Sequence, residues 1–382
     1  MDATDGETPA DSGHTGETDQ VGPLGRRIRM AAGIAGVGAL VMAVLPLFEG
    51  DGMMERTAVG KVVDAATAGG YALADEILPA VSATPTEGAS GSPSAEPSPT
   101  STATAPPPPL EDDEWTLFGS SLDFTVGGGF SSWVEHVDYR FGTLPVVRAF
   151  NQAFPRSWSV ADTVAGRTVV VSFKANPQQV VSGQLDRRLR EWFASAPTTG
   201  EIYWTYFHEP EDNIARGQFT AEEFREAWKH IHGIAEEAGN DNQFATLILM
   251  GWTTNPSSRR DFADYYPGDE YVDVLGWDSY NFGHRQGRYS DPEELFERVI
   301  EVSEEAGKPW GIAETGSLLV DGDDGSGRAA WLSRVGAYLN DQGALWVTYF
   351  ESNVGEDFRL HDQASRDAWR ELVRASSRAA AR

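Results

Sequence analysis

Two glutamates, Glu209 and Glu314, each lie at the end of an apolar, strand-like run of the chain. Cleavage of a glycosidic bond needs two carboxyl groups beside the scissile bond. One protonates the leaving oxygen, and the other attacks the anomeric carbon or activates a water molecule. A single glutamate after a strand also serves as a helix cap or an ion-pair partner. The pair therefore points to glycosidase chemistry only if the fold brings both strand ends together.

The elements that must position this pair follow from an alternating pattern that begins at about Trp115. Apolar runs alternate there with helical or loop segments, which indicates parallel strands joined by right-handed crossovers. The eight runs are Leu117–Asp123, Leu144–Asn151, Thr168–Lys174, Ile202–His208, Ala245–Trp252, Val272–Tyr280, Trp310–Glu314 and Leu345–Glu351. The clearest helical stretches are Val180–Ala194, Ala221–Ala238, Pro292–Ala306, Ala329–Asp341 and Gln363–Ser376. Eight such units predict an α/β fold, a (β/α)8 TIM barrel.

A doubly wound sheet is the alternative fold. It would need a glycine-rich phosphate loop after the first strand, and Gly127-Gly128-Gly129 does not fit the G-x-G-x-x-G spacing.

A barrel carries its active site at the C-terminal ends of its strands. Glu209 follows the fourth run and Glu314 ends the seventh, so the two face each other across the barrel mouth. Lys174 ends the third run, where pairing with a carboxylate is the expected role. Trp204, Trp277 and Trp346 are expected in the core. The candidate substrate-binding residues at the mouth are His208, Trp252, Asp278, Tyr280 and Asn281.

Four motifs in this part of the chain resemble clan A glycoside hydrolases, and most closely family 26. They are YFHE at 206–209, KPWGIAETGS at 308–317, YVDVLGWDSYN at 271–281 and SGQLD at 182–186. The resemblance covers about residues 115–375. It implies a retaining mechanism with Glu209 as general acid/base and Glu314 as nucleophile. It also implies that Tyr280 donates its hydroxyl to Glu314, and that His208 orients the acid/base or contacts the sugar.

The chain departs from the family directly after Glu209. Family members commonly continue with Met-Asn-Gly, whereas Pro210-Glu211-Asp212 follows here. The added negative charge predicts a raised pKa for Glu209, which suits an acid. The departure leaves the polymer open among mannan, mixed-linkage glucan and xylan, all of which the family accepts.

Bulk composition excludes several classes of function. The formal net charge of -28 argues against a partner made of nucleic acid and against docking on anionic lipid. The absence of cysteine excludes disulfides, thiolate catalysis and zinc–thiolate sites. We expect no cofactor and no metal. His230 and His232 are spaced two apart on a helix and point to different sides, and the acidic loop 321–325 is expected to be a turn and helix cap.

The residue pattern of the N-terminal segment, residues 1–114, predicts a membrane anchor. Residues 1–29 are expected to be a disordered cytoplasmic tail, and the uncharged run 30–48 a transmembrane helix. The cluster Arg26-Arg27-Ile28-Arg29 precedes this run, so the positive-inside rule places the rest of the chain outside the cell. Residues 49–114 are expected to be a Pro/Ser/Thr-rich extracellular linker to the catalytic domain 115–382. The alternative is a cleaved signal peptide and a secreted enzyme.

The resulting prediction is a membrane-anchored enzyme that hydrolyses O-glycosidic bonds in an extracellular β-linked polysaccharide. One alternative is an inactive barrel that binds cell-surface glycan. The other is a wall-remodelling transglycosylase, which would share every residue named above.

Overall fold

The computed structural model describes residues 116–122, 129–151, 154, 158, 164 and 166–380. The predicted tail 1–29, transmembrane helix 30–48 and linker 49–114 lie outside these residues, as do Trp115 and Asp123. Among the helices of the described part, none is both long and apolar enough to cross a membrane.

Eight strands close into a parallel barrel in which each strand pairs with the next and β8 pairs with β1. The strands are β1 (Leu117–Ser121), β2 (Val146–Asn151), β3 (Thr168–Phe173), β4 (Ile202–Tyr206), β5 (Gln243–Met250), β6 (Val274–Asp278), β7 (Trp310–Thr315) and β8 (Trp346–Tyr349). The predicted (β/α)8 barrel is therefore confirmed. The doubly wound alternative is excluded because a doubly wound sheet has two open edges and this sheet closes on itself.

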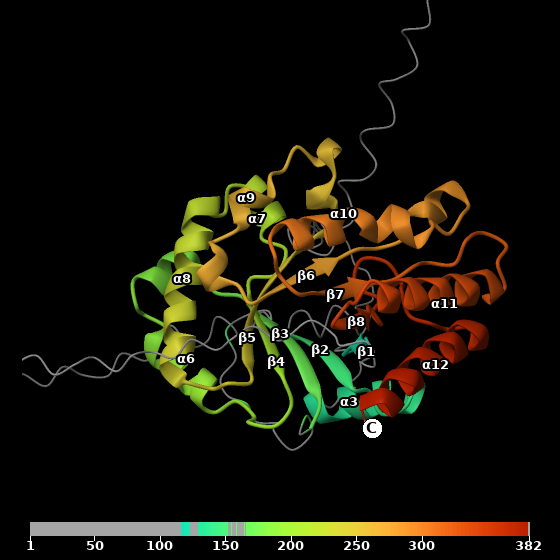
Figure 1. Ribbon diagram of the computed structural model, residues 1–382, viewed down its shortest axis with the longest axis horizontal. Coiled ribbons are helices and arrows are strands. Elements are labelled where there is room, and N and C mark those ends of the chain that lie inside the picture. The colour runs from blue at the N-terminus through green and yellow to red at the C-terminus, as the bar shows by residue number, and fades with distance from the viewer. Residues whose placement is uncertain are drawn as a thin grey trace, which may run out of the picture.

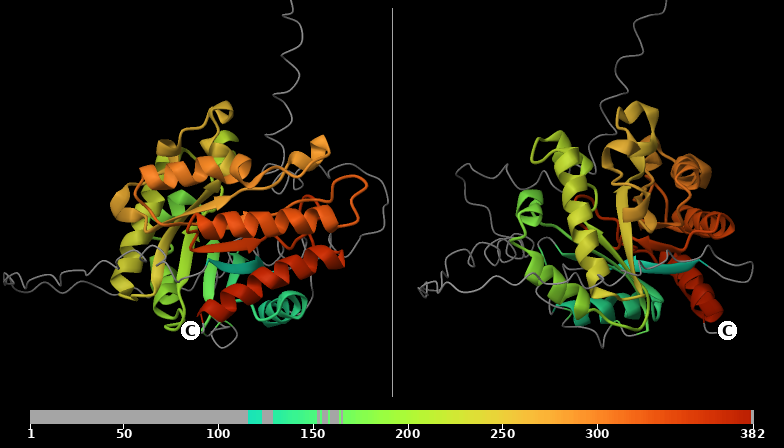
Figure 2. Two further views of the ribbon diagram at one scale, coloured as in Figure 1. Left: turned by 45° about the vertical axis from the view of Figure 1, so that its right-hand side comes forward. Right: turned by 60° about the vertical axis from the view of Figure 1, so that its left-hand side comes forward.

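Helices surround the strands on the outside of the barrel (Figure 1). The longer ones are α3 (Phe130–Phe141), α6 (Asp186–Ala194), α8 (Ala221–Ala238), α10 (Pro292–Glu305), α11 (Ser326–Asp341) and α12 (Gln363–Ala380). The last two run side by side in both views of Figure 2. Short helices fill the connections: α5 (Pro177–Val181), α7 (Glu211–Ala215), α9 (Phe262–Tyr265) and the 3-10 turns η1 (Gly251–Thr254), η2 (Pro256–Ser258), η3 (Asp269–Tyr271) and η4 (Gly283–Gln286).

The predicted helices differ from the structure in two places. The single helix predicted over 180–194 is wrong, because α5 ends at Val181 and Gly183 adopts a left-handed φ of 78° before α6 begins. Helix α3 was not among the predicted helices. Its signal was present, since Val134, Val137 and Phe141 are buried at helical spacing.

The core has two layers. The larger layer packs the outer faces of the strands against the helices, and the smaller one fills the barrel interior around Trp346. A side chain on Gly311 would meet the Trp346 ring at 2.5 Å, so glycine is required where that ring crosses the barrel. Trp204 and Trp277 are buried as well, so all three predicted core tryptophans are confirmed.

The acidic loop 321–325 caps α11. Asp323 accepts hydrogen bonds from the backbone N–H groups of Gly327 and Arg328, each at 2.9 Å, which confirms the predicted turn and cap. His230 Nε2 lies 2.7 Å from an oxygen of Asp186, and the His232 ring packs against Tyr271. Within the described residues, no group of three or more His, Asp and Glu side chains is arranged to hold a metal ion.

Candidate active site

Glu314 is the last residue but one of β7, and its carboxylate is held by two donors. Tyr280, two residues beyond β6, donates its hydroxyl to Oε2 at 2.6 Å, the contact that the family resemblance implies. Arg148 Nη2 lies 3.5 Å from Oε1. Burial raises the pKa of Glu314, whereas the Arg148 cation and the Tyr280 hydrogen bond act in the opposite direction. Both donors favour an ionised Glu314.

Arg148 is a residue that the sequence analysis missed. It lies within β2, points into the barrel and is fully buried. Its other guanidinium nitrogen donates to Ser172 Oγ at 3.0 Å, and its charge lies 4.2 Å from the centre of the Phe150 ring. A lone arginine inside the apolar run VVRAF was the available signal. A buried cation needs an anionic partner, and here the partner is Glu314.

Glu209 occupies a backbone conformation unlike that of Glu314. Strand β4 ends at Tyr206, and both Phe207 (φ 55°) and Glu209 (φ 48°) are left-handed, a conformation that is uncommon outside glycine. The turn is tied to its neighbouring strands on both sides. The Phe207 N–H donates to Phe173 O at 2.8 Å, and the Glu209 N–H donates to Ile248 O at 3.1 Å.

The environment of Glu209 favours a proton on its carboxyl. Burial raises its pKa well above the usual value, and the negative charges of Glu314 and Glu211 raise it further. The Lys174 ammonium opposes this rise. The altered loop therefore raises the pKa of Glu209, which is the direction that the sequence predicted.

Lys174 lies over the Phe207 ring, with its Nζ 4.8 Å from the ring centre. Burial lowers the pKa of Lys174, and the charges of Glu209 and Glu314 counteract that effect. No described carboxylate lies within ion-pair distance of its Nζ, so the expected ion pair is absent from this part of the chain. The cation acts on the glutamates through space.

Two further polar groups at the mouth have no hydrogen-bond partner among the described residues. Asp278 ends β6 in register with Glu314, and neither of its buried carboxyl oxygens is bonded. Burial, followed by the charges of Glu314 and Glu209, raises the pKa of Asp278. His208 is buried beside the Phe150 ring with Nδ1 unbonded, and burial together with Lys174 and Arg148 lowers its pKa, which keeps the ring neutral. Unsatisfied buried groups of this kind suit a ligand rich in hydroxyls.

The remaining two candidates lie differently. Asn281 is fully buried and its side chain is occupied: it donates to Ser317 Oγ at 2.8 Å and accepts from the backbone N–H groups of Gly283 and Ser290. Asn281 therefore organises the loop after β6. Trp252 lies in η1 directly after β5 and is half-buried, so part of its ring stays accessible at the rim.

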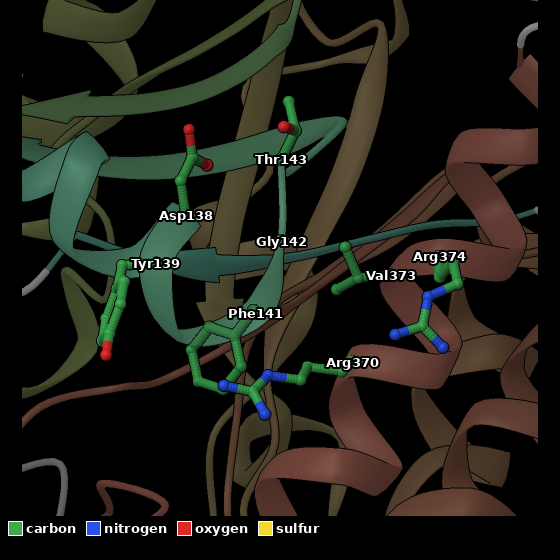
Figure 3. Close-up of a pocket in the computed structure, with 8 residues that line it drawn as sticks. All are labelled: Asp138, Tyr139, Phe141, Gly142, Thr143, Arg370, Val373 and Arg374. Carbon is green, nitrogen blue, oxygen red and sulfur yellow. The ribbon is translucent and has the colours of Figure 1, made fainter.

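A separate hollow of about 470 Å³ lies between the C-terminal end of α3 and α12 (Figure 3). Its one carboxylate, Asp138, is bound by both terminal nitrogens of Arg167 at 2.9 and 2.7 Å. The C-terminal end of α3 precedes β2, so this hollow is near the end of the barrel opposite the glutamates.

Comparison with known proteins finds the same family that the sequence motifs resemble. A family model for glycosyl hydrolase family 26 matches residues 179–319, a stretch that contains both glutamates. Over this stretch the chain matches family 26. Members of this family are glycosyl hydrolases, which act on O-glycosyl compounds.

Two curated relatives match parts of this chain. Endoglucanase H of Acetivibrio thermocellus is 26% identical over 167 residues, which are 41% of this chain and 18% of that protein. A mannan endo-1,4-β-mannosidase of Bacillus subtilis is 31% identical over 97 residues, which are 24% of this chain and 22% of that protein. The chain thus spans about a fifth of the length of each relative.

A solved structure shares the barrel fold. The catalytic domain of a family 26 endo-β-1,4-mannanase from Bacillus sp. JAMB-750 has a TM-score of 0.50 at 15% identity, over 68% of this chain and 86% of that chain. At this identity the similarity concerns the fold alone.

Proposed function

We propose that the barrel is a retaining glycosidase that cleaves O-glycosidic bonds in a β-linked polysaccharide, with Glu209 as acid/base and Glu314 as nucleophile. The supporting observation is the unequal environment of the two carboxyl groups. Arg148 and Tyr280 favour the ionised form of Glu314, whereas burial and two nearby carboxylates favour the protonated form of Glu209. Environments that separate two carboxyl pKa values in this way suit one acid and one nucleophile.

The chemistry would proceed in two displacements. Glu314 attacks the anomeric carbon while Glu209 gives its proton to the glycosidic oxygen, so the C–O bond breaks and a glycosyl–Glu314 ester forms. Glu209, now ionised, takes a proton from a water molecule whose oxygen attacks the same carbon. This step releases the sugar with retained configuration and returns both glutamates to their first states.

For the substrate we propose a mannan-like polymer, with mixed-linkage β-glucan and xylan as the other polymers to be tested. The family, together with the name of the Bacillus subtilis relative, favours mannan. The residues after Glu209 set this chain apart, because Glu211 and Asp212 add two carboxylates beside the leaving-group side of the site.

For the location we propose that residues 30–48 anchor the chain and that the barrel works outside the cell. The support is the basic cluster before an uncharged run, which favours a cytoplasmic N-terminus. Protease treatment of intact cells tests this: an extracellular barrel is degraded, and a protected barrel contradicts the orientation. Recovery of the chain in the medium instead of the membrane fraction would identify a secreted enzyme.

The decisive experiment incubates the purified full-length protein with each of the three polymers beside Glu314→Ala. New reducing ends from the wild type alone support the proposal. No new reducing ends on any polymer, combined with retained binding to one of them, would identify a glycan-binding barrel. Products longer than the substrate would identify a transglycosylase. NMR of the first-formed product tests retention, which an inverted anomer excludes.

A further inference from the structure

The residues that replace the usual family sequence after Glu209 form a buried clamp. Glu211 opens α7 and is 1% exposed. Its Oε1 accepts hydrogen bonds from the backbone N–H of Met250 at 2.9 Å and from Thr253 Oγ1 at 2.7 Å. Both donors belong to the end of β5 and the turn that follows it. Glu211 therefore joins the turn that carries Glu209 to the neighbouring strand.

This hydrogen bond adds to a backbone contact two residues earlier in the chain. The Glu209 N–H already donates to Ile248 O, so the turn is attached to β5 at two successive points. Asp212 forms an ion pair with Arg260, which fixes α7 from the side of the loop before α9. Left-handed conformations at Phe207 and Glu209 are strained, and they persist only where the surroundings over-determine them. The clamp supplies that constraint on the α7 side.

The second oxygen of Glu211 has a different role. Among the described residues Oε2 has no hydrogen-bond partner. No second donor among these residues therefore offsets the negative charge that this carboxylate places beside Glu209. Burial raises the pKa of Glu211, but the hydrogen bonds that its carboxylate accepts and the Arg260 cation oppose that rise. These groups favour the ionised form of Glu211.

From these contacts we infer that Glu211 is a positioning residue for Glu209. Its bonded oxygen holds the strained turn in the conformation that aims Glu209 at the leaving oxygen, and its free oxygen supplies a negative charge that keeps the acid protonated. The inference rests on the acid/base role proposed for Glu209. A Glu211 that only stabilised the fold would explain why the turn is held, but not the effect of its charge on the protonation of Glu209.

Several other charged groups also shift the pKa of Glu209. Lys174, directly after β3, lowers the pKa of Glu209, while Glu314 on β7 and Asp212 on α7 raise it. Further charged and titratable groups around this site are Arg148 on β2, His208 after β4, Tyr265 on α9, Asp278 on β6 and Tyr280 beyond it. None of them is changed by a substitution at Glu211.

Two substitutions separate position from charge. Glu211→Gln keeps an amide oxygen that can accept from Met250 and Thr253 but removes the charge. Its plateau kcat is expected within about threefold of wild type, and the alkaline limb of its kcat/KM profile is expected about 0.5 to 1 pH unit lower. Glu211→Ala also removes the clamp, so its kcat is expected to fall about 10- to 100-fold with little change in KM, because a displaced acid transfers its proton poorly.

The control is Glu237→Gln, which removes the charge of an exposed glutamate on α8 and is expected to leave both limbs unchanged. Thermal melting of the full-length variants shows whether each is folded. A Glu211→Gln enzyme with the wild-type alkaline limb overturns the charge role. A folded Glu211→Ala enzyme with wild-type kcat overturns the positioning role.

A substrate-free measurement distinguishes failure of this inference from failure of the proposed function. NMR of protein labelled with ¹³C at glutamate side-chain carboxyls, with the Glu209 signal assigned from Glu209→Gln, follows its titration directly. The Glu209 midpoint is expected to fall by the same 0.5 to 1 unit in Glu211→Gln. An unchanged midpoint overturns the inference even in a protein that hydrolyses no polymer. A shifted midpoint in an inactive protein sustains the charge effect and rejects the glycosidase proposal alone.

Discussion

The end of β7 and the turn after β4 each present one glutamate to the barrel mouth, but they are built differently. Glu314 lies within β7, where the pairing with β6 and β8 shifts register, and receives its partners from side chains on β2 and beyond β6. Glu209 occupies a left-handed turn that backbone hydrogen bonds hold, and among the described residues its carboxyl has no donor like those of Glu314. The difference shows how one barrel rim gives two identical side chains opposite roles. Direct donors favour the charged form, and burial beside like charges favours the neutral form.

The largest expected effect comes from Glu314→Ala. Loss of the nucleophile is expected to lower kcat about 10⁴-fold or more on the polymer that the wild type hydrolyses, since no neighbouring carboxylate can form the same ester. Azide is expected to restore turnover and to yield a glycosyl azide of inverted configuration. A retained-configuration azide product from this variant would contradict the assignment of roles.

Glu209→Ala is expected to have an effect that depends on the leaving group. On the polymer, whose leaving oxygen needs a proton, kcat/KM is expected to fall about 10²- to 10⁴-fold. On an aryl glycoside with an acidic phenol the loss in kcat/KM is expected to be much smaller, because that phenolate leaves without protonation. Equal losses on both substrates would assign Glu209 a role other than acid catalysis.

Tyr280→Phe removes the shorter of the two bonds to Glu314. The kcat is expected to fall about 10- to 100-fold, at or below the lower end of the range of about 10²- to 10³-fold seen when one preorganised donor is removed. Because the Tyr280 bond lowers the pKa of Glu314, its loss raises that pKa. The acid limb of kcat/KM is therefore expected to move to higher pH, and a fixed acid limb would contradict the proposed ionisation of Glu314.

The smallest expected effect comes from Lys174→Met. The ammonium lowers the pKa of Glu209, so its removal is expected to raise the alkaline limb by about half a unit. This direction is opposite to that expected for Glu211→Gln. The kcat/KM profiles of the two variants are measured in one buffer series. If their alkaline limbs moved in the same direction, the opposite effects assigned to Lys174 and Glu211 would be wrong.

Much of the site could be predicted from the sequence because strand and helix periodicity are local properties. The alternating runs predicted the closed barrel, and the resemblance of residues 271–281 to the family implied the Tyr280 contact that the structure contains. Asn281 shows the limit of that reasoning. Its position in a motif indicated the mouth, but its amide is occupied by Ser317, Gly283 and Ser290. Which polar groups remain free depends on neighbours that no local pattern specifies.

The order of the strands, and a glutamate after the fourth strand and near the end of the seventh, can be predicted from the sequence alone. The groups that surround each glutamate depend on the folded chain. Arg148 reaches Glu314 across 166 positions of the chain, and Glu211 reaches Met250 across 39. Those contacts arise from barrel closure, which sets the distances between strand ends. The ionisation of each carboxyl follows from these distances and from burial, and both are properties of the folded chain.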